Sequence, residues 1–409
     1  MAIQHLAFFE ALAELPDESC PDWRTTSAGL LTLRFVDAWA YENESLVKSD
    51  SWSMRSLRRT ISEMDARDPK RAILLSVVDT MRSVKTPGMA VIAPRLLAYA
   101  RALQFDAKWS LAADVYSAVL RHVQAFEDPA LVIHAYMQIG ACKRVLAKWD
   151  EALAAYSLAA DLARIAKNTE EMLRARVAEA NVNADRGNLP KAEQILDEAI
   201  KTAGDAGLTE IRAIATQDRG HVAHLRGNYD LAIQLAYEAL GSMGAQAARD
   251  RVLADLAATF AEVGLRSAAR DANLILMATA QEQYTRWVAT INLLELAALD
   301  RMEPVFEQYR RELASVELPA ALAVYYHYYA GQGFRIFGQF TAAKASLQRA
   351  IAIASQHNLN EMLMRAEQSL HELDDGSVVR MKQVADPSQV VSEVAEAIRE
   401  MRALVGVAG

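Results

Sequence analysis

The chain has 409 residues, 52% of them hydrophobic, with only 10 prolines and 17 glycines. A chain of this length can form a large core or a long repeat, and so few helix breakers favour helices over a sheet protein. The net charge of −8 disfavours a general nucleic-acid binder, which would normally be basic. Cys20 and Cys142 have no metal-ligand spacing and form no disulfide framework.

The N-terminal stretch, MAIQHLAFFEALAEL, predicts an amphipathic helix and not a signal peptide. It lacks a basic segment, and His5, Glu10 and Glu14 interrupt the apolar positions. No stretch is apolar for long enough to span a bilayer, which takes roughly 18 residues or more, so no membrane span is expected. The expected location is the cytoplasm.

Residues 1–92 predict helices at 3–14, 22–47, 51–66 and from Pro69 to about Val84. Pro16 ends the first, and Asp68 is placed to cap the last. No phrase repeats here, so we expect a block of degenerate repeats or a cap. The block contains a basic run, formed by Arg55, Arg58, Arg59, Arg67, Lys70 and Arg71. This run indicates a solvated face, and a nucleic-acid-binding or enzymatic module is the alternative.

One phrase recurs between residues 106 and 232. It is DAKWSLA at 106–112, LAKWDEA at 146–152, RGNLPKA at 186–192 and RGNYDLA at 226–232, so its closing alanines recur at one constant interval. A small residue ends one helix, a large apolar residue (Trp109, Trp149, Leu189 or Tyr229) opens the next as a packing group, and the alanine permits close helix approach. The phrase predicts stacked antiparallel helix hairpins, because one hairpin cannot bury its apolar face alone.

The phrase resembles the tetratricopeptide repeat in a long-helix variant of about 40 residues. The small residues of the first helix, Ala100, Gly140, Ala180 and Gly220, follow the same interval. The resemblance implies an all-α, right-handed superhelical solenoid of antiparallel helix hairpins. The phrase weakens between 263 and 310 and returns as FGQFTAA at 337–343, with Gly331 before it and Phe340 as the packing group.

These patterns predict four regions: an N-terminal block at 1–92, about seven units and a capping helix at 93–373, a linker at 374–386 and an amphipathic helix at 387–409. The last helix has an apolar stripe spaced by three and four residues, formed by Val391, Val394, Ile398, Met401 and Val405. It can dock on its own solenoid. The alternative is pairing with a second copy, as a homodimer, or with another protein.

No catalytic motif is present: the chain has no P-loop, dinucleotide-binding glycine motif, HExxH or GxSxG. We therefore expect no enzyme and no cofactor. His221 and His224 are the best metal candidates, because they lie three residues apart on one helix face. A third ligand is missing, since His134 belongs to a repeat two units earlier, so no metal site is predicted.

The resemblance places certain positions of each first helix on the concave surface. The predicted groove residues are Arg101, Gln104, His134, Arg144, Arg174, Asn181, Gln217, His221, His224, Tyr325, Tyr328, Gln332 and Arg335. Arg and Tyr are common anchors of interfaces, and Arg pairs well with carboxylates. The arginines indicate an acidic or carboxylate-ended peptide. The alternative is ordinary solvated residues paired with local Glu and Asp.

Two further features bear on function. Asn181 matches one position of the carboxylate clamp for chaperone tails, but the other positions do not match, so that activity is not predicted. The run from Tyr325 to Tyr329 points all round a helix, so some of its tyrosines must be core.

We expect a non-enzymatic scaffold or adaptor that binds a protein or peptide. A bacterial regulatory sensor that responds to a peptide or ligand is the alternative.

Overall fold

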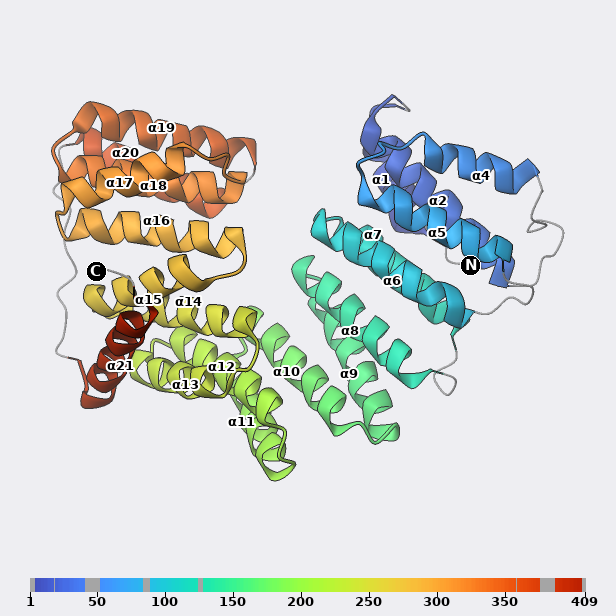
Figure 1. Cartoon of the computed structure of the whole chain (residues 1–409), viewed down its shortest axis with the longest axis horizontal. Coiled ribbons are helices and arrows are strands. Elements are labelled where there is room, and N and C mark those ends of the chain that lie inside the picture. Colours follow the sequence, from blue (N-terminus) through green and yellow to red (C-terminus); the bar gives the residue numbers. More distant parts are fainter. Residues whose placement is uncertain are drawn as a thin grey trace. The chain divides into compact units, whose positions relative to one another are not determined.

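The structure is a computed structural model that describes residues 4–17, 19–40, 52–83, 89–123, 128–357, 359–375 and 387–406. Within these ranges every regular element is an α-helix and no strand occurs, so the predicted all-α class is confirmed. Two compact units, unit 1 (residues 1–203) and unit 2 (residues 204–409), are described separately (Figure 1). In this part of the chain, no helix has the length and apolar character needed to cross a membrane.

The regular middle of the chain consists of helices of equal length, joined by short turns of equal length. The successive helices are α8 (Pro129–Val145), α9 (Trp149–Ile165), α10 (Thr169–Asp185), α11 (Leu189–Asp205) and α12 (Thr209–Leu225). One helix with its turn takes up half of the sequence interval, so one hairpin corresponds to one copy of the repeated phrase. Each helix is about 25 Å long, so helices within a hairpin can pack along their whole length.

The small residue that ends each first helix adopts the left-handed backbone conformation. The φ angles are 57° and 54° at the two alanines and 78° and 76° at the two glycines, in the order Ala107, Ala147, Gly187 and Gly227. The following N–H bonds back five residues, as Lys148 does to the carbonyl of Lys143 at 2.9 Å. This is the Schellman motif, which satisfies carbonyls at a helix end. The predicted turn is therefore confirmed.

Close helix approach depends on the small residues of the first helix. A Cβ atom at Gly140 of α8 would lie 2.5 Å from the Tyr156 ring of α9. The predicted packing groups differ among themselves: Trp109 and Trp149 pack against buried clusters, whereas Phe340 is 61% exposed. The prediction for Phe340 is thus wrong, because its helix already packs through residues such as Leu347, which lies against Gly331.

Unit 1 begins with helices that share one core with the first regular repeat. They are α1 (Leu6–Glu14), α2 (Pro21–Ala40), α4 (Trp52–Ser62), α5 (Pro69–Ser83), α6 (Met89–Phe105) and α7 (Trp109–His122). Buried residues from α1 to α8 form a single cluster. The predicted cap is present at α5, where the Asp68 carboxylate accepts the Lys70 N–H at 2.9 Å.

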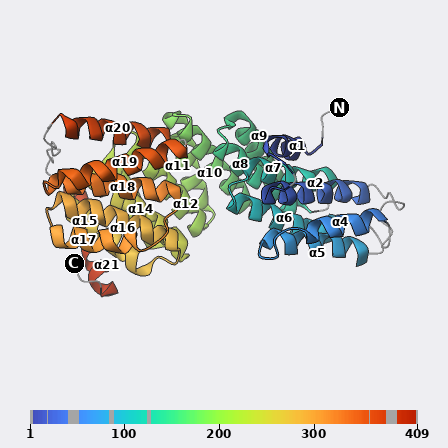
Figure 2. The same ribbon diagram turned by 90° about the horizontal axis from the view of Figure 1, so that it is seen from above.

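Helix α1 lies against α2 and α7 (Figure 2). A buried polar network fixes it there. His5 bridges two carboxylates, Asp37 at 2.9 Å and Asp114 at 3.1 Å. His122 contacts the other oxygen of Asp37 at 2.6 Å, and Arg121 lies 3.4 Å from Asp37. Burial disfavours the charged imidazole, but the two carboxylates outweigh it and raise the pKa of His5. Burial also opposes ionisation of Asp37, yet these partners lower its pKa.

Unit 2 continues the hairpins in two layers. After α12 its helices are α13 (Tyr229–Ser242), α14 (Gln246–Glu262), α15 (Arg266–Thr279), α16 (Gln283–Leu299), α17 (Glu303–Ala314), α18 (Ala320–Ile336), α19 (Phe340–Gln356) and α20 (Asn360–Asp374). Three pairs of even-numbered helices approach each other directly: α12 and α14, α16 and α18, and α18 and α20. Among described residues, α13, α15, α17 and α19 show no comparable approach to one another. We call the even-numbered set the inner layer, because curvature of a hairpin stack crowds the helices on its concave side.

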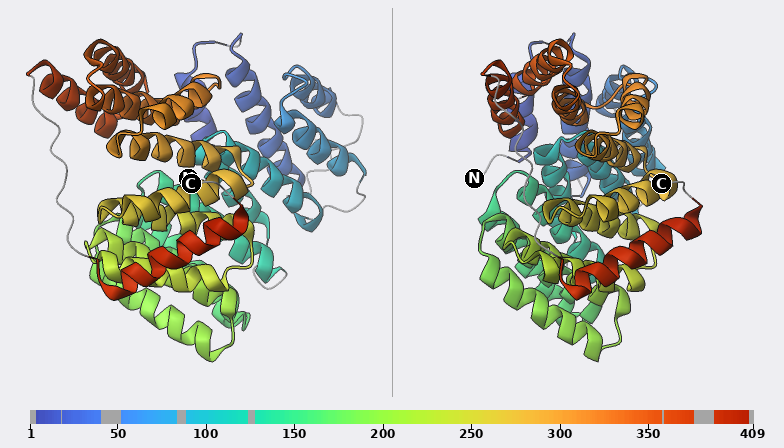
Figure 3. Two further views of the ribbon diagram at one scale, coloured as in Figure 1. Left: turned by 60° about the vertical axis from the view of Figure 1, so that its left-hand side comes forward. Right: turned by 90° about the vertical axis from the view of Figure 1, so that its left-hand side faces the viewer.

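The last helix, α21 (Gln389–Val405), lies against α13 and α15 of the same chain (Figure 3). Val391, Val394 and Ile398 are buried in the cluster of unit 2 that includes those helices. Arg402 donates to Asp271 at 2.8 Å, and Ser388 caps the helix by accepting the Val391 N–H at 3.4 Å. The apolar stripe from Val391 to Met401 therefore docks on its own unit in the structure, which was the first of the two alternatives. Val405, predicted as the end of that stripe, is 39% exposed, so its prediction is wrong.

Candidate functional site

The arginines predicted for the groove in unit 1 have carboxylate neighbours. Arg144 donates to Asp185 at 2.6 Å, and Arg174 donates to Glu170 at 2.7 Å. Arg101 is exposed, and no described residue forms an ion pair with it. Two of the three predicted cations are thus balanced within the unit, which weakens the argument for an acidic partner.

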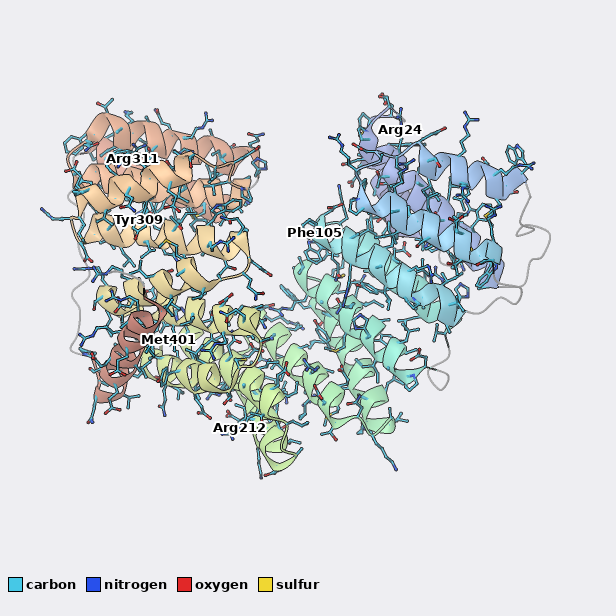
Figure 4. The ribbon with its side chains drawn as sticks, viewed as in Figure 1. Arg24, Phe105, Arg212, Tyr309, Arg311 and Met401 are labelled. Carbon is cyan, nitrogen blue, oxygen red and sulfur yellow. The ribbon has the colours of Figure 1, made fainter. Side chains whose placement is uncertain are left out.

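The remaining predicted residues of unit 1 are polar side chains of α6, α8 and α10, namely Gln104, His134 and Asn181. Gln104 accepts from the Tyr116 hydroxyl at 3.0 Å and donates to Gln138 at 3.2 Å, so its amide serves packing. Burial, together with the charge of Arg101, lowers the pKa of His134. Asn181 is partly buried on α10. Phe105, beyond them at the end of α6, is 92% exposed (Figure 4).

The N-terminal basic run is largely paired with carboxylates. Arg59 lies 3.2 Å from Glu63, and Arg67 lies 3.1 Å from Asp65. Three more of its ion pairs join Arg58 to Asp79, and Lys70 to both Asp68 and Asp106. This pairing supports a solvated face and offers nothing distinctive for phosphate recognition.

In unit 2, the three predicted groove residues of α12, Gln217, His221 and His224, lie in different environments. Gln217 donates to Asp255 at 2.9 Å. His224 lies 3.0 Å from the Thr259 hydroxyl, whereas His221 is exposed. Among the residues that the structure describes, no three His, Cys, Asp or Glu side chains are grouped to hold a metal ion.

The tyrosine run on α18 divides between core and inner layer. Tyr326 is buried, and its hydroxyl donates to the Arg310 carbonyl at 3.3 Å. Tyr325 and Tyr329 stack with ring centroids 6.2 Å apart, and Tyr328 meets Tyr329 edge-on at 5.3 Å. These three rings are only partly buried, so they offer apolar faces on the inner layer.

A hydrogen-bonded chain connects this ring cluster to α20. Gln332 donates to the Ser369 hydroxyl at 2.7 Å, and that hydroxyl lies 3.5 Å from the Tyr328 oxygen. Arg335 is buried and lies 3.3 Å from Glu372. Three of the four residues predicted for this repeat, Tyr328, Gln332 and Arg335, therefore contact α20 directly, and their orientation is fixed by those contacts.

Two ionisable residues beside the tyrosine rings of α18 were not among the residues predicted from the sequence. Glu295 on α16 is close enough to the Tyr329 hydroxyl for that hydroxyl to lower its pKa. The Arg365 guanidinium of α20 lies 5.2 Å from the Tyr328 ring centroid. We call Glu295, Tyr325, Tyr328, Tyr329 and Arg365 the Glu295 site. A signal was available, because Glu295 is the one carboxylate in α16 and lies within the apolar stretch INLLELAAL.

The Glu295 site has unusual electrostatics. Burial is the main cause that raises the pKa of Glu295, to about 7. The charge of Arg365 lowers the pKa, the carboxylate of Glu262 raises it, and the hydrogen bond with Tyr329 lowers it. Burial, and then the charge of Glu295, also raise the pKa of the Tyr329 hydroxyl. The site can therefore change its charge near neutral pH.

No protein-family description matches this chain, and no curated protein does. Among solved structures, a tetratricopeptide repeat protein from Parabacteroides merdae is similar over 67% of this chain and 98% of its own, with 14% identity and a TM-score of 0.43. The solved structures that the present chain resembles are tetratricopeptide-repeat proteins. A signal-transduction ATPase with a tetratricopeptide repeat sensor, from Pyrococcus horikoshii, is similar over 97% of this chain and 68% of its own (11% identity, TM-score 0.49).

A further similar structure is the Rap conjugation gene regulator of the plasmid pLS20 in complex with the Phr* peptide. The similarity covers 93% of this chain and 96% of that one, at 12% identity and a TM-score of 0.46. Similarities of this degree concern the tetratricopeptide-like fold alone. The function has to be argued from the side chains of the present structure.

Proposed function

We propose that this tetratricopeptide-like protein is a non-enzymatic, cytoplasmic scaffold or adaptor that binds a peptide segment of a partner protein on the inner layer of unit 2. The observation that carries the proposal is the group of partly buried tyrosine rings beside Arg365. Tyr and Arg side chains contribute most to protein interfaces when they are partly desolvated and held in place. Here the contacts with α20 hold Tyr328, so little conformational entropy is lost on binding.

The inner layer also offers polar groups for a peptide backbone. Gln332 and Ser369 join α18 to α20 and lie next to Tyr328. An extended segment needs such donors and acceptors because its own backbone groups are otherwise left unpaired on binding. The predicted residues of unit 1, including Arg101, are proposed as a second contact region.

The proposal is tested by affinity capture from an extract of the native cell. Wild-type protein is compared with a Tyr325→Ala/Tyr328→Ala variant, whose helix content is verified by circular dichroism. The matched control is Tyr237→Ala, because Tyr237 is an exposed tyrosine on α13 of the other layer. We expect a partner that wild type and the control retain and the double variant loses. Equal retention by all three would refute the assignment of binding to this face.

A further inference from the structure

Among the described residues, the carboxylate of Glu295 forms no ion pair, although the charge of Arg365 acts on it. Among the described residues, no Lys, Arg or His nitrogen forms an ion pair with it within 4.0 Å, and the Tyr329 hydroxyl is the neighbouring polar group that favours its ionised form. Two other carboxylates of unit 2 differ, since Asp271 pairs with Arg402 and Asp300 pairs with Arg266. A desolvated carboxylate without a cation is unfavourable in its ionised form.

The tyrosine rings of the Glu295 site are suited to a cation. Arg365 already demonstrates this within the chain, because its guanidinium lies 5.2 Å from the centroid of the Tyr328 ring. Tyr325 and Tyr329 add two further rings, stacked on each other along α18. Aromatic faces attract cations through the ring quadrupole, and they also cover the aliphatic part of a long side chain.

We propose that the Glu295 site binds a Lys or Arg side chain of the partner peptide. The ammonium or guanidinium group pairs with the Glu295 carboxylate, and the aliphatic stem lies on the rings of Tyr325 and Tyr329. The proposal rests on the proposed function and specifies the chemistry of its ligand. It differs from the expectation of an acidic peptide, which came from arginines that the structure pairs with Asp185 and Glu170.

Other charged groups near α16 leave Glu295 available. Arg365 of α20 and Glu262 of α14 act on it through their charges, and Tyr329 of α18 through its hydrogen bond. The cations that α15 and α17 carry nearby are engaged elsewhere: Arg266 and Arg270 with Asp300, and Arg310 with Glu307. A ligand cation would therefore be the main new charge at this carboxylate.

The test uses labelled synthetic peptides that differ only at the central residue, which is Arg, Lys, Gln or Glu, with degenerate uncharged flanks. Binding to the full chain is measured by fluorescence anisotropy. We expect the Arg and Lys pools to bind at least about tenfold more tightly than the Gln pool. Glu295→Gln should abolish this preference while retaining the binding of the Gln pool. The matched control is Glu361→Gln, which removes an exposed carboxylate 3.7 Å from Arg365.

Affinity for the Arg pool should also depend on pH. A cation binds the ionised carboxylate, and a pKa of about 7 means that ionisation of Glu295 rises from about one in eleven molecules at pH 6 to about ten in eleven at pH 8. The affinity should therefore increase about tenfold between these pH values for wild type, and remain flat for Glu295→Gln. Tyr329→Phe removes a hydrogen bond to the carboxylate, so its profile should move to higher pH.

The outcomes separate the two proposals. Equal binding of the Arg and Gln pools by wild type, or an Arg preference that survives in Glu295→Gln, overturns the inference and leaves peptide binding in place. Failure of every pool to bind overturns both proposals. A preference for the Glu pool would restore the acidic partner that the sequence indicated.

Discussion

The docking of α21 on its own unit can be tested by truncating one buried side chain, that of Ile398. Ile398 is 0% exposed and packs in the cluster formed with α13 and α15. Replacing a fully buried Ile by Ala typically costs about 2–5 kcal/mol, through lost burial and a residual cavity. Because α21 follows the rest of the chain through one connecting segment, this loss should appear as easier undocking of the helix and not as global unfolding.

The assay is amide hydrogen exchange of residues 389–405, followed by mass spectrometry. For Ile398→Ala we expect protection of α21 to fall by about 30-fold to several thousand-fold, which corresponds to about 2–5 kcal/mol. Protection of α16 to α20 should remain unchanged. The control is Leu404→Ala in the same helix, where the side chain is 89% exposed, so the change should stay within about 0.5 kcal/mol.

Two results would refute this reasoning. Identical exchange in Ile398→Ala and Leu404→Ala would mean that Ile398 does not hold the helix in place. Protection that decreases when the wild-type protein is diluted would mean that α21 docks on a second copy, as the alternative of a homodimer requires. Docking within one chain predicts exchange that is independent of concentration.

Three further predictions concern unit 1. Ala147→Gly relieves the strain of a left-handed φ of 54°, so it should raise the free energy of unfolding in urea by about 0.5–1 kcal/mol. The control is Ala154→Gly, at an exposed position inside α9, which should lower that free energy by about 1 kcal/mol. Gly140→Ala forces a Cβ to 2.5 Å from the Tyr156 ring and should destabilise by about 1–3 kcal/mol in the same assay; a neutral result would show that the ring moves freely. The raised pKa of His5 adds stability that is complete below its unfolded value of 6.5 and is lost as pH rises through the folded value. The protection factor of α1, which is corrected for the intrinsic pH dependence of amide exchange, should therefore fall over that range. His5→Gln should remove this fall, and a fall that persists would exclude His5 as its source.

Local features of the fold could be predicted because neighbouring residues determine them. Asp128 before Pro129 is the residue pattern of a helix start, and in α8 the Asp128 carboxylate accepts the Leu131 N–H at 3.0 Å. Asn168 likewise accepts the Glu171 N–H at 3.1 Å, as a capping residue does. The predicted limits of the N-terminal block and the linker remain predictions.

The candidate site was less accessible to sequence reasoning. The repeat register indicated Tyr328 and Gln332, because both follow from the position of a residue within the first helix of a hairpin. It could not indicate that Glu295 lies beside them, since that carboxylate belongs to the preceding repeat and has no counterpart in the repeated phrase. Nor could it indicate that Arg144 is paired with a residue 41 positions later.

The sequence by itself determined the helices, their turns and the interval of the repeat, because caps, left-handed turn residues and apolar spacing act between near neighbours in the chain. Only the tertiary structure decided where the last helix docks and which charges are balanced. Arg402 meets Asp271 across 131 positions, and the Glu295 site joins three separate helices. Such contacts depend on how hairpins stack, and the burial that raises the pKa of Glu295 exists only once they have stacked.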